Sequence, residues 1–441
     1  MAEDTDGTIW IGTNSGGVNH YNPEKGTFKV YSMSGQKDFV AESNDIKAIY
    51  ISPDNCIYVG AHAGGLSAID KKTGAVTHFE STSPLGTALN VYAIAPAGNS
   101  KLWIGTLEGI KLFDMKSKRF VDFDNSVFVQ NAIKDILIDS EGRLGIGGED
   151  GVEVYRRAAD GSMEVLKAGK GSVYADINVQ CLFESSTGQV WAGTRTGLMS
   201  YNPRTDSVAV FTSRNGLPSE IIHSIEEDSF GRLWVSTDRG LSCMDTVSGK
   251  FRNFSSEDGL QSNYFNSGSS CRTSGGVMMF GGLSGITTFI PEEMEDNPFT
   301  PKPLLTGLKI FDTPVYPSDG SGILSKSITM TQKIVLKHNQ NTISIDFAVT
   351  NYLSGKNNTF AYILEGYDPL WQYSHKRRSI SWSNLKHGKY RFLVKAANND
   401  GKWSEPTSLE IVIKPVWYQT IAAECSYIML IMMAFIFAYL S

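Results

Sequence analysis

The sequence predicts an all-β protein in which a seven-repeat β-propeller is followed by an immunoglobulin-like β-sandwich and a C-terminal transmembrane helix. Three observations predict this order. A hairpin pattern recurs seven times within residues 1–290, a different set of alternating strands fills residues 304–415, and residues 421–440 are almost wholly apolar. Residues 291–303, which are rich in proline and acidic residues, form the predicted linker between the two β domains.

The clearest repeat is DSFGRLWVSTDRGL, residues 228–241. Asp228 to Gly231 reads as a tight polar turn, the next residues alternate between apolar and polar, and Asp238 to Gly240 turns the chain back. Alternation with a period of two, closed by glycines, predicts a β-hairpin. Seven copies align at a mostly aromatic position, 42 to 48 residues apart: Trp10, Tyr58, Trp103, Gly145, Trp191, Trp234 and Met279. A strand-rich period of about 40–50 residues indicates a β-propeller.

Each repeat also has an apolar strand before the hairpin and an aromatic-ended strand after it, as in residues 222–226 and 250–254, which gives a four-stranded blade. Large aromatic residues bury the most apolar area, so we expect them to pack between blades. These residues are Trp10, Trp103, Trp191 and Trp234. No apolar strand precedes the first hairpin, and the seventh lacks an outer strand. We therefore expect the propeller to be N-terminally incomplete, with Met1 not the natural start, or to be closed by a strand from residues 304–311.

The repeat Asp-x-x-Gly-x-Leu-Trp-Ile-Gly-Thr, followed by Gly-Gly-Leu, resembles the two-component regulator propeller repeat. The resemblance is strongest at the four tryptophans and weakest at Gly145 and Met279. It implies a sensor module.

The second β domain, residues 304–415, has short alternating strands at the spacing of an immunoglobulin-like sandwich. The segments NTISIDF (341–347), FAYILEGYDPLW (360–371) and SWSNLKHGKYRFLVKAANNDGKWSE (381–405) resemble the triple-tyrosine domain, which follows regulator propellers in hybrid two-component sensors. Tyr362 and Tyr390 match two of its tyrosines, and Trp382 stands at the third. We expect Trp371, Trp403 and Tyr390 inside the core.

Residues Ile421 to Leu440 contain a single charged side chain, Glu424. About 20 apolar residues suffice to cross a bilayer, so the sequence predicts a transmembrane helix here, with a buried hydrophobic helix as the alternative. The resemblance implies an inner-membrane protein with periplasmic β domains. The residues themselves do not indicate this orientation.

Composition and spacing exclude several kinds of chemistry. A net charge of −6 and a pI near 5.7 do not suit a nucleic-acid partner. The five cysteines and seven histidines have no metal-ligand spacing, and no phosphate-binding GxxxxGK[ST] motif occurs, so we expect no metal and no cofactor. Sialidase-type propellers have Asp-x-Gly-x-x-Trp, whereas two residues separate Asp228 from Gly231 here. We expect no catalytic residues, and a glycan-cleaving propeller or a passive carbohydrate- or protein-binding scaffold remains the alternative.

The hairpin turns predict a ligand-binding rim, because the turn inside each tryptophan hairpin and the loop into the next blade open on the same face. Its residues are Asn14, His62, Glu108, Glu149, Arg195, Arg239 and Ser284. Arg195 and Arg239, in neighbouring blades, could hold a carboxylate or sulfate. Solvated turn residues, or a cleft between two propellers, are the alternatives.

The resemblance implies the ligand-sensing half of a Bacteroidetes hybrid two-component sensor. Such a protein responds to oligosaccharide fragments and signals as a homodimer, for which we expect the sandwich domain to make the contact. The kinase and DNA-binding domains of these sensors are not in this sequence.

Overall fold

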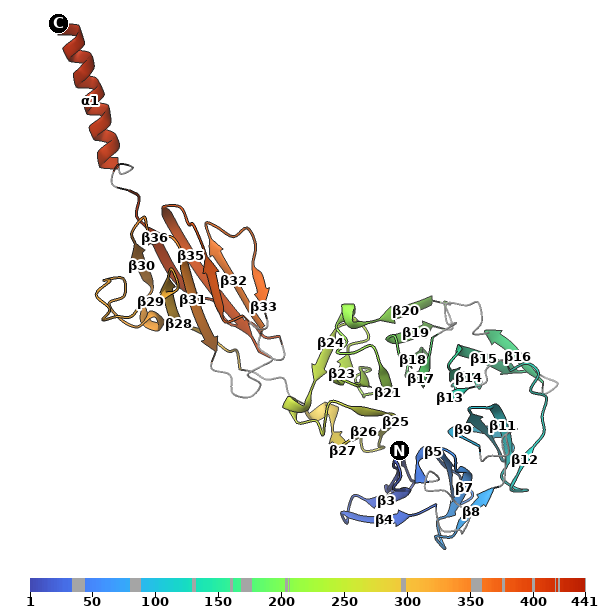
Figure 1. Cartoon of the computed structure of the whole chain (residues 1–441). Helices are drawn as coiled ribbons and strands as arrows, with labels where there is room; N and C mark the ends of the chain where they lie inside the picture. The colour runs from blue at the N-terminus through green and yellow to red at the C-terminus, as the bar shows by residue number, and fades with distance from the viewer. Residues whose placement is uncertain are drawn as a thin grey trace. The chain divides into compact units, whose positions relative to one another are not determined.

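The computed structural model describes residues 1–33, 44–79, 89–128, 132–158, 162–167, 177–202, 205, 207–294, 299–349, 359–374, 377–398, 401–416, 418 and 421–440. The chain forms two compact units, Met1–Met294 and Glu295–Ser441. The first is a ring of small sheets and the second contains a two-sheet sandwich (Figure 1). The predicted propeller and sandwich are therefore both present.

Seven antiparallel sheets make the ring, one for each repeat in the sequence. Their strands are, in blade 1, β1 (Ala2–Glu3), β2 (Ile9–Gly12), β3 (Val18–Asn22) and β4 (Thr27–Tyr31); in blade 2, β5 (Ile46–Ile51), β6 (Cys56–Ala61), β7 (Gly65–Asp70) and β8 (Val76–Phe79); in blade 3, β9 (Val91–Gly98), β10 (Lys101–Thr106), β11 (Gly109–Asp114) and β12 (Arg119–Val121); in blade 4, β13 (Ile133–Ile138), β14 (Leu144–Gly148), β15 (Gly151–Arg157) and β16 (Met163–Lys167); in blade 5, β17 (Val179–Glu184), β18 (Val190–Thr194), β19 (Leu198–Asn202) and β20 (Ser207–Phe211); in blade 6, β21 (Ile222–Glu227), β22 (Leu233–Thr237), β23 (Gly240–Met244) and β24 (Phe251–Phe254); and in blade 7, β25 (Phe265–Arg272), β26 (Met278–Gly282) and β27 (Gly285–Phe289). Three short 3₁₀ helices, η2 (Ser213–Asn215), η3 (Ser256–Asp258) and η4 (Pro291–Glu293), follow blades 5, 6 and 7.

In blades 1, 4 and 6 an aspartate stabilises the turn that opens the hairpin. In blade 6, Asp228 Oδ1 accepts hydrogen bonds from the backbone N–H groups of Phe230 and Arg232, at 3.0 and 2.9 Å. Its Oδ2 accepts from Arg232 Nε at 2.6 Å and from the Trp234 indole Nε1 at 2.9 Å. Gly231 has a φ of 75°, which only glycine adopts at little cost. The recurring Asp, Gly and Trp of the repeat thus form one hydrogen-bonded unit.

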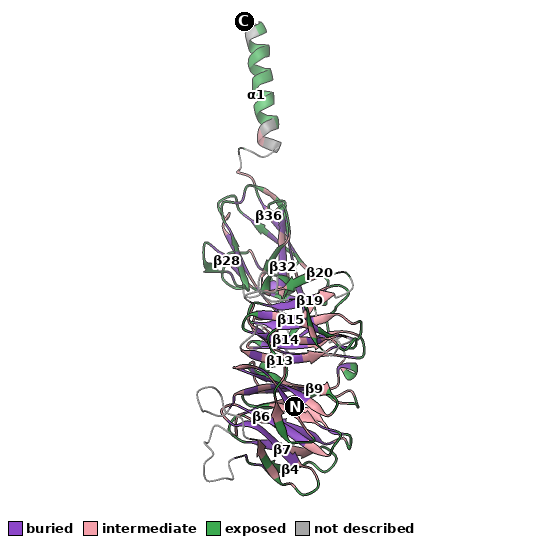
Figure 2. Cartoon of the chain, turned by 90° about the vertical axis from the view of Figure 1, so that its right-hand side faces the viewer, coloured by how far each residue is buried: buried purple, intermediate pink, exposed green. Residues whose placement is uncertain are grey.

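The aromatic side chains pack between blades, because each one reaches the sheet that follows it. Trp234 lies in a core cluster with Phe265 and Phe280 of blade 7. Trp10, Trp103 and Trp191 contact the next blade in the same way, and all four tryptophans are buried. Figure 2 shows buried residues along the strands of successive blades.

The N-terminal residues supply only the last two positions of the first strand of blade 1, so an N-terminally incomplete propeller stays a prediction, whereas closure by residues 304–311 is wrong. The two-residue strand β1 pairs with β2, so blade 1 has four strands in the structure. The segment 304–311 does not close the ring, since β28 (Pro303–Ile310) pairs with β31 (Ile343–Val349) inside the sandwich. Within the described residues blade 7 has three strands, in agreement with the expectation that an outer strand is lacking there.

Serine–glutamate pairs link successive blades and also close the ring. The backbone N–H and the hydroxyl of Ser186 donate to Glu227 on the next blade, at 2.6 and 2.9 Å. Ser274 of blade 7 donates to Glu3 of β1 with the same two groups, at 2.6 and 2.9 Å. Because Glu3 occupies the place that Glu227 has on β21, β1 acts as a true first strand despite its length.

The sandwich has a four-stranded and a five-stranded sheet with one hydrophobic core between them. The sheets contain, in order, β29, β28, β31 and β34, and β30, β36, β35, β32 and β33. Their bounds are β28 (Pro303–Ile310), β29 (Thr313–Pro314), β30 (Lys333–Leu336), β31 (Ile343–Val349), β32 (Thr359–Glu365), β33 (Gln372–Ser374), β34 (Ser379–Trp382), β35 (Gly388–Ala397) and β36 (Thr407–Ile413), with the 3₁₀ helix η5 (Ile328–Met330) before β30.

The three aromatic residues of the triple-tyrosine pattern, Tyr362, Trp382 and Tyr390, are buried in this core. Trp403, in contrast, is 37% exposed, so its predicted place in the core is wrong. Trp371 is only partly buried and also lies outside the core cluster. The ammonium group of Lys395 lies over both indole rings, 4.7 Å from Trp371 and 5.0 Å from Trp403, so these side chains form a surface cation–π group.

The C-terminal segment forms the predicted helix, α1 (Ile421–Leu440), and large apolar side chains such as Met432 and Phe437 are exposed on it (Figure 2). Among the residues that the structure describes, no helix is long and apolar enough to cross a membrane. The predicted transmembrane helix is therefore not confirmed as a membrane span.

Candidate functional site

The hairpin turns and the starts of the innermost strands meet on one face of the propeller. In blades 2, 4 and 5 the first turn residue after the second strand donates its backbone N–H to the carbonyl oxygen of the residue immediately before the first strand of the same blade. Three such bonds are His62 to Asp45 O at 2.9 Å, Glu149 to Ala132 O at 3.3 Å and Arg195 to Asn178 O at 3.1 Å. The turns also bond to the next blade, as Gly65 N does to Leu89 O at 3.0 Å. We call this face, with its turns and first-strand starts, the mouth.

A ring of polar side chains occupies the second position of the innermost strands at the mouth. These residues follow buried apolar residues at the strand starts, and neighbouring first strands contact one another round the ring. They are Lys47, Tyr92, Lys134, Gln180, His223 and Asn266. These residues were not among the predicted site residues, although a polar residue after the first apolar residue of the strand is visible in blades 2 to 7 once the repeats are aligned.

Tyr92 connects blades 2, 3 and 4 at the mouth. Its hydroxyl lies 3.3 Å from His62 Nδ1, and the Lys134 ammonium group lies 4.2 Å from the centre of its ring. Burial raises the pKa of Tyr92, and the neighbouring carboxylates of Asp45, Glu108 and Glu149 act in the same direction. Tyr92 is therefore a neutral phenol within a cluster of charged side chains.

Cations of three blades interact at this point. Burial lowers the pKa of Lys134, and the positive charges of Arg195 and Lys47 lower it further, while Glu149 opposes the shift. Lys47 is paired with Asp45, whose carboxylate lies 2.9 Å from its ammonium nitrogen. Burial is the main cause of this shift, but Lys134, Arg195 and Lys47 also act on one another, so three cations from three blades are available at the mouth for an anionic group.

His223 extends the same network through blades 5, 6 and 7. Burial lowers the pKa of His223, with Arg195 acting in the same direction and Asp238 opposing it. Its Nδ1 lies 2.9 Å from Ser267 Oγ, and that hydroxyl donates to Gln180 Oε1 at 3.5 Å. Ser267 lies in a bulge of β25, between the register partners Phe265 and Ser270, and β25 contacts β17 of blade 5 as well as β21. The bulge therefore extends toward the centre of the ring.

The structure assigns the predicted rim residues to two different turn positions. The first turn position carries His62, Glu149 and Arg195, and its equivalents in blades 3 and 6 are Leu107 and Asp238. The second carries Glu108 and Arg239, whose backbone N–H groups both donate to the threonine hydroxyl two residues earlier, at 3.0 Å. The residue equivalent to Arg195 in blade 6 is therefore Asp238 and not Arg239.

The two remaining rim residues lie at the ends of the predicted series. When the Asn14 amide is oriented with its nitrogen toward the Asp45 carboxylate, this nitrogen donates to Asp45 Oδ2 at 3.1 Å. Asn14 is thereby part of the network at the mouth. Ser284 is exposed, and its backbone N–H donates to Gln261 Oε1 at 2.9 Å.

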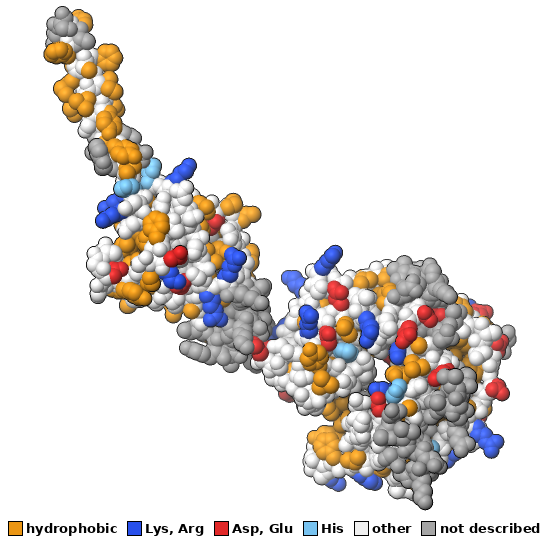
Figure 3. Space-filling view, viewed as in Figure 1, with side chains coloured by type: hydrophobic (Ala, Val, Ile, Leu, Met, Phe, Trp, Pro, Cys, Tyr) orange, Lys and Arg blue, Asp and Glu red, His pale blue; other side chains and the backbone are white. Residues whose placement is uncertain are grey.

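Two acidic oxygens at the mouth are buried and have no hydrogen-bond partner in the structure, Glu108 Oε2 and Asp238 Oδ1. A buried acceptor without a donor is costly, so both are places where a ligand hydroxyl would be stabilised. Acidic, basic and histidine side chains are interspersed on the propeller face drawn in Figure 3. Within the described ranges, no group of three or more His, Cys, Asp or Glu side chains could hold a metal ion.

Comparison with known proteins supports both modules. Residues 216–239 match the two component regulator propeller family, and residues 351–414 match the Y_Y_Y domain family. The curated relative Histidine kinase P4 of Formosa agariphila is 27% identical over 97% of this chain and 32% of its own length.

Two solved structures are similar over most of the chain. The extracellular domain of the hybrid two component system BT3049 from B. thetaiotaomicron is 28% identical, with a TM-score of 0.78, over 94% of this chain and 55% of that one. The extracellular domain of BT4673, also from B. thetaiotaomicron, shares the fold at 24% identity and a TM-score of 0.53, over 94% and 57% of the two chains. This chain thus spans about a third of the curated relative and about half of these structures.

The recognition of regulator propeller repeats followed by a triple-tyrosine domain is therefore confirmed, and over nearly its whole length the chain is similar to the extracellular sensor domain of a hybrid two-component system.

Proposed function

We propose that this chain is the ligand-sensing part of a membrane-bound two-component sensor, with its β domains in the periplasm. The observation that carries the proposal is the similarity, over 94% of the chain, to the extracellular domain of a hybrid two-component system. The relative named as a histidine kinase supports a kinase output on another part of the protein. In this view the chain recognises a ligand and does not catalyse a reaction.

The chemistry of the mouth favours a glycan fragment that carries an acidic group. Lys47, Lys134 and Arg195 supply positive charge for a carboxylate or sulfate. The unpartnered oxygens of Glu108 and Asp238 can accept hydrogen bonds from sugar hydroxyls. Pockets that combine a few convergent polar groups with aromatic surface are typical of ligand sites, and Tyr92 provides the aromatic surface here. The other predicted rim residues also belong to the proposed site, and they are Asn14, His62, Glu149, Arg239 and Ser284.

The proposed signal is a change in the arrangement of two sandwich domains in a homodimer. A ligand shifts such an equilibrium only by its difference in affinity for the two states. Strand β36 belongs to the sandwich core and ends at Ile413, shortly before α1 begins at Ile421. A movement of the sandwich would therefore pass to α1, which we propose as the connection to the membrane and to the output domains.

Binding and turnover measurements on residues 1–415 test the proposal. We expect calorimetry against neutral, uronate-containing and sulfated oligosaccharides to detect binding of an acidic glycan, and chromatography to show that every glycan is unchanged after incubation. Cleavage of a glycan that is lost when one carboxylate at the mouth is substituted would instead support the glycan-cleaving alternative. Binding of neutral glycans alone would reject the proposed role of the mouth cations.

A further inference from the structure

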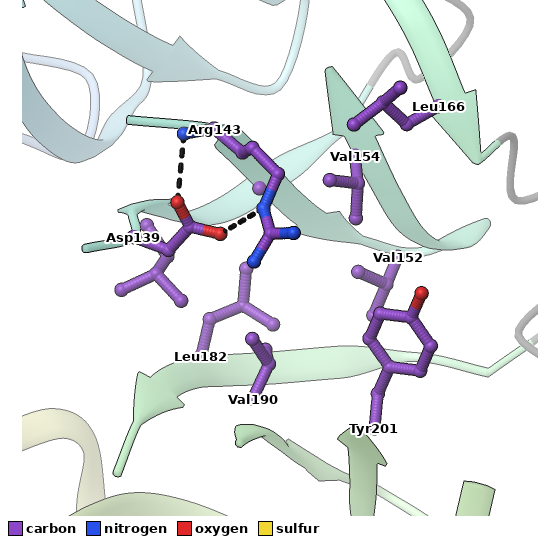
Figure 4. Close-up of a pocket in the computed structure, with 10 residues that line it drawn as sticks. Asp139, Arg143, Val152, Val154, Leu166, Leu182, Val190 and Tyr201 are labelled. Carbon is purple, nitrogen blue, oxygen red and sulfur yellow. Dashed lines mark hydrogen bonds and ion pairs between the residues drawn. The ribbon is translucent and has the colours of Figure 1, made fainter. Parts of the chain in front are cut away.

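One interface of the ring contains a hollow where the repeat is degraded. In blade 4 the aromatic position of the repeat is Gly145, and a cavity of about 180 Å³ lies beside it, between blades 4 and 5. Its walls are apolar, and the Asp139–Arg143 pair lies on one side with Tyr201 on the other (Figure 4). The other residues that line it are Leu137, Val152, Val154, Leu166, Leu182 and Val190.

Blade 6 shows what fills the corresponding space in an intact repeat. The indole of Trp234 packs between Phe254 of its own blade and Phe289 of the next, with ring centres 5.5 and 4.6 Å away. Its N–H donates to Asp228 Oδ2 at 2.9 Å. The space between these blades therefore accepts a flat aromatic ring with one N–H donor.

Blade 4 keeps every other bond of this unit. Asp139 Oδ1 accepts from the backbone N–H groups of Glu141 and Arg143, at 3.1 and 2.8 Å, and its Oδ2 accepts from Arg143 Nε at 2.6 Å. These distances repeat those of Asp228 in blade 6. Gly145 follows Asp139 by six residues, as Trp234 follows Asp228. Only the indole N–H is missing, so Asp139 Oδ2 keeps the geometry of an acceptor for it.

The walls of the hollow have not closed over the missing ring. A Cβ atom placed on Gly145 would meet its nearest neighbours, from Leu137 and Leu182, at 3.6 to 3.7 Å, which is ordinary van der Waals contact. Tyr201 of blade 5 is paired with Val190, just as Phe289 of blade 7 is paired with Met278. Phe289 is the ring partner that blade 7 provides for Trp234 of blade 6. Tyr201 therefore occupies the equivalent position beside the hollow of blade 4. The core cluster at this interface includes one small residue, Ala192, among larger apolar side chains.

We propose that this hollow is a binding site for an indole-type ring, with its N–H donating to Asp139 Oδ2 and its face against Tyr201. An apolar cavity of about 150 Å³ binds benzene in another protein, so this slightly larger hollow is in the size range of cavities that take up a small aromatic ring. The ring could belong to a free heterocycle or to a tryptophan side chain of a peptide, and the two share this chemistry. The site is separate from the mouth and does not depend on the proposed glycan ligand.

Binding of 5-fluoroindole to the full chain, followed by ¹⁹F NMR, tests the proposal. We expect saturable binding to the parent protein and none to Gly145→Trp, in which the side chain fills the hollow and raises the melting temperature. Indene, which has the shape of indole without the N–H, should bind about tenfold more weakly if Asp139 accepts the hydrogen bond. N-acetyltryptophanamide distinguishes a free heterocycle from a tryptophan side chain of a peptide. If it binds as 5-fluoroindole does, the result points to a peptide side chain.

Trp234→Gly provides a matched positive control, because it creates the same hollow in blade 6 beside a carboxylate with the same bonds. Indole binding to that variant but not to the parent would overturn the proposal. Equal binding to the parent and to Gly145→Trp would overturn it as well, and this comparison remains decisive even if Trp234→Gly does not fold.

Discussion

Blades 4, 5 and 6 contain the parts of one structural unit in different combinations. Blade 6 has both the carboxylate of Asp228 and the indole of Trp234, joined by a hydrogen bond of 2.9 Å. Blade 4 has the carboxylate of Asp139 but Gly145 in place of the indole. Blade 5 has the indole of Trp191 but Ser185 in place of the carboxylate, and the Trp191 Nε1 atom is buried without a hydrogen-bond partner in the structure.

This comparison indicates that the turn and the indole are independent. In blade 4 the turn persists because Asp139 is satisfied by backbone N–H groups and by Arg143. In blade 5 the indole persists because its apolar contacts with blade 6 remain, although its N–H lacks an acceptor. A propeller tolerates such losses because each blade packs mainly against its neighbours, so a local defect remains local.

The largest effect is expected when the indole is removed from the intact unit. Trp234→Ala removes a side chain that is 2% exposed and leaves Asp228 without one of its donors. We expect the free energy of unfolding of the propeller to fall by about 3–5 kcal/mol. Chemical denaturation of the full chain measures this. Trp403→Ala is a suitable control, since that indole is at the surface of the sandwich and should cost less than about 1 kcal/mol; equal losses for the two variants would contradict our burial argument.

Asp135 is a second carboxylate at the interface of blades 4 and 5. Unlike Asp139, it has no arginine partner among the described residues, so its burial can be compared with that of a paired carboxylate. Asp135 accepts hydrogen bonds from the backbone N–H groups of Leu182 and Ile136, at 2.7 and 2.8 Å. Burial raises the pKa of Asp135 to about 6, and these hydrogen bonds only partly offset that effect. The folded protein therefore binds a proton at Asp135 more tightly than the unfolded chain does.

The stability that protonated Asp135 contributes is present below pH 4 and is lost as the pH rises through 6. Compared with Asp135→Asn, the parent should lose about 2 kcal/mol of unfolding free energy between pH 4 and pH 7. Denaturation curves of both proteins at pH 4, 5, 6 and 7 measure the difference. A difference that is constant across this range would show that Asp135 titrates normally.

The smallest effect is expected from restoring the carboxylate to blade 5. The double variant Ser185→Asp, Gln189→Arg copies the Asp228 and Arg232 positions and gives the Trp191 N–H an acceptor. Satisfying one buried donor should increase the unfolding free energy by about 1 kcal/mol. Thermal unfolding of the variant and the parent gives the change, and the single Ser185→Asp variant, without the arginine, should gain less. A double variant that is less stable than the parent would show that the blade 5 turn cannot adopt the blade 6 geometry.

The repeat pattern predicted the ring well because its period, its Asp turns and its tryptophans all have a local physical meaning. Strand β1 was missed because a strand of two residues has no periodicity to detect. The location of Trp403 was wrong because size alone does not decide burial, and Lys395 stabilises that indole at the surface.

The candidate site was less predictable than the fold. The turns of blades 5 and 6 both read Thr-x-x-Gly-Leu, so aligning their threonines would have shown that Asp238, and not Arg239, corresponds to Arg195. The polar residues on the innermost strands, such as Tyr92 and Lys134, could have been selected from the aligned repeats. Their contact with the turn residues, however, depends on the closed ring, which brings together blades far apart in the sequence.

The central claim, that the mouth of the propeller binds an acidic glycan, is tested most directly by calorimetry on two variants. Lys134→Ala, Arg195→Ala removes two of the three cations whose charges interact at the mouth, and Arg239→Ala removes a cation from the second turn position. With a uronate-containing or sulfated oligosaccharide that binds the parent, we expect the double variant to bind at least tenfold more weakly and Arg239→Ala, which removes a single rim cation, to bind about twofold more weakly. Equal affinity of the parent and the double variant, or no binding of any acidic glycan by the parent, would contradict the claim.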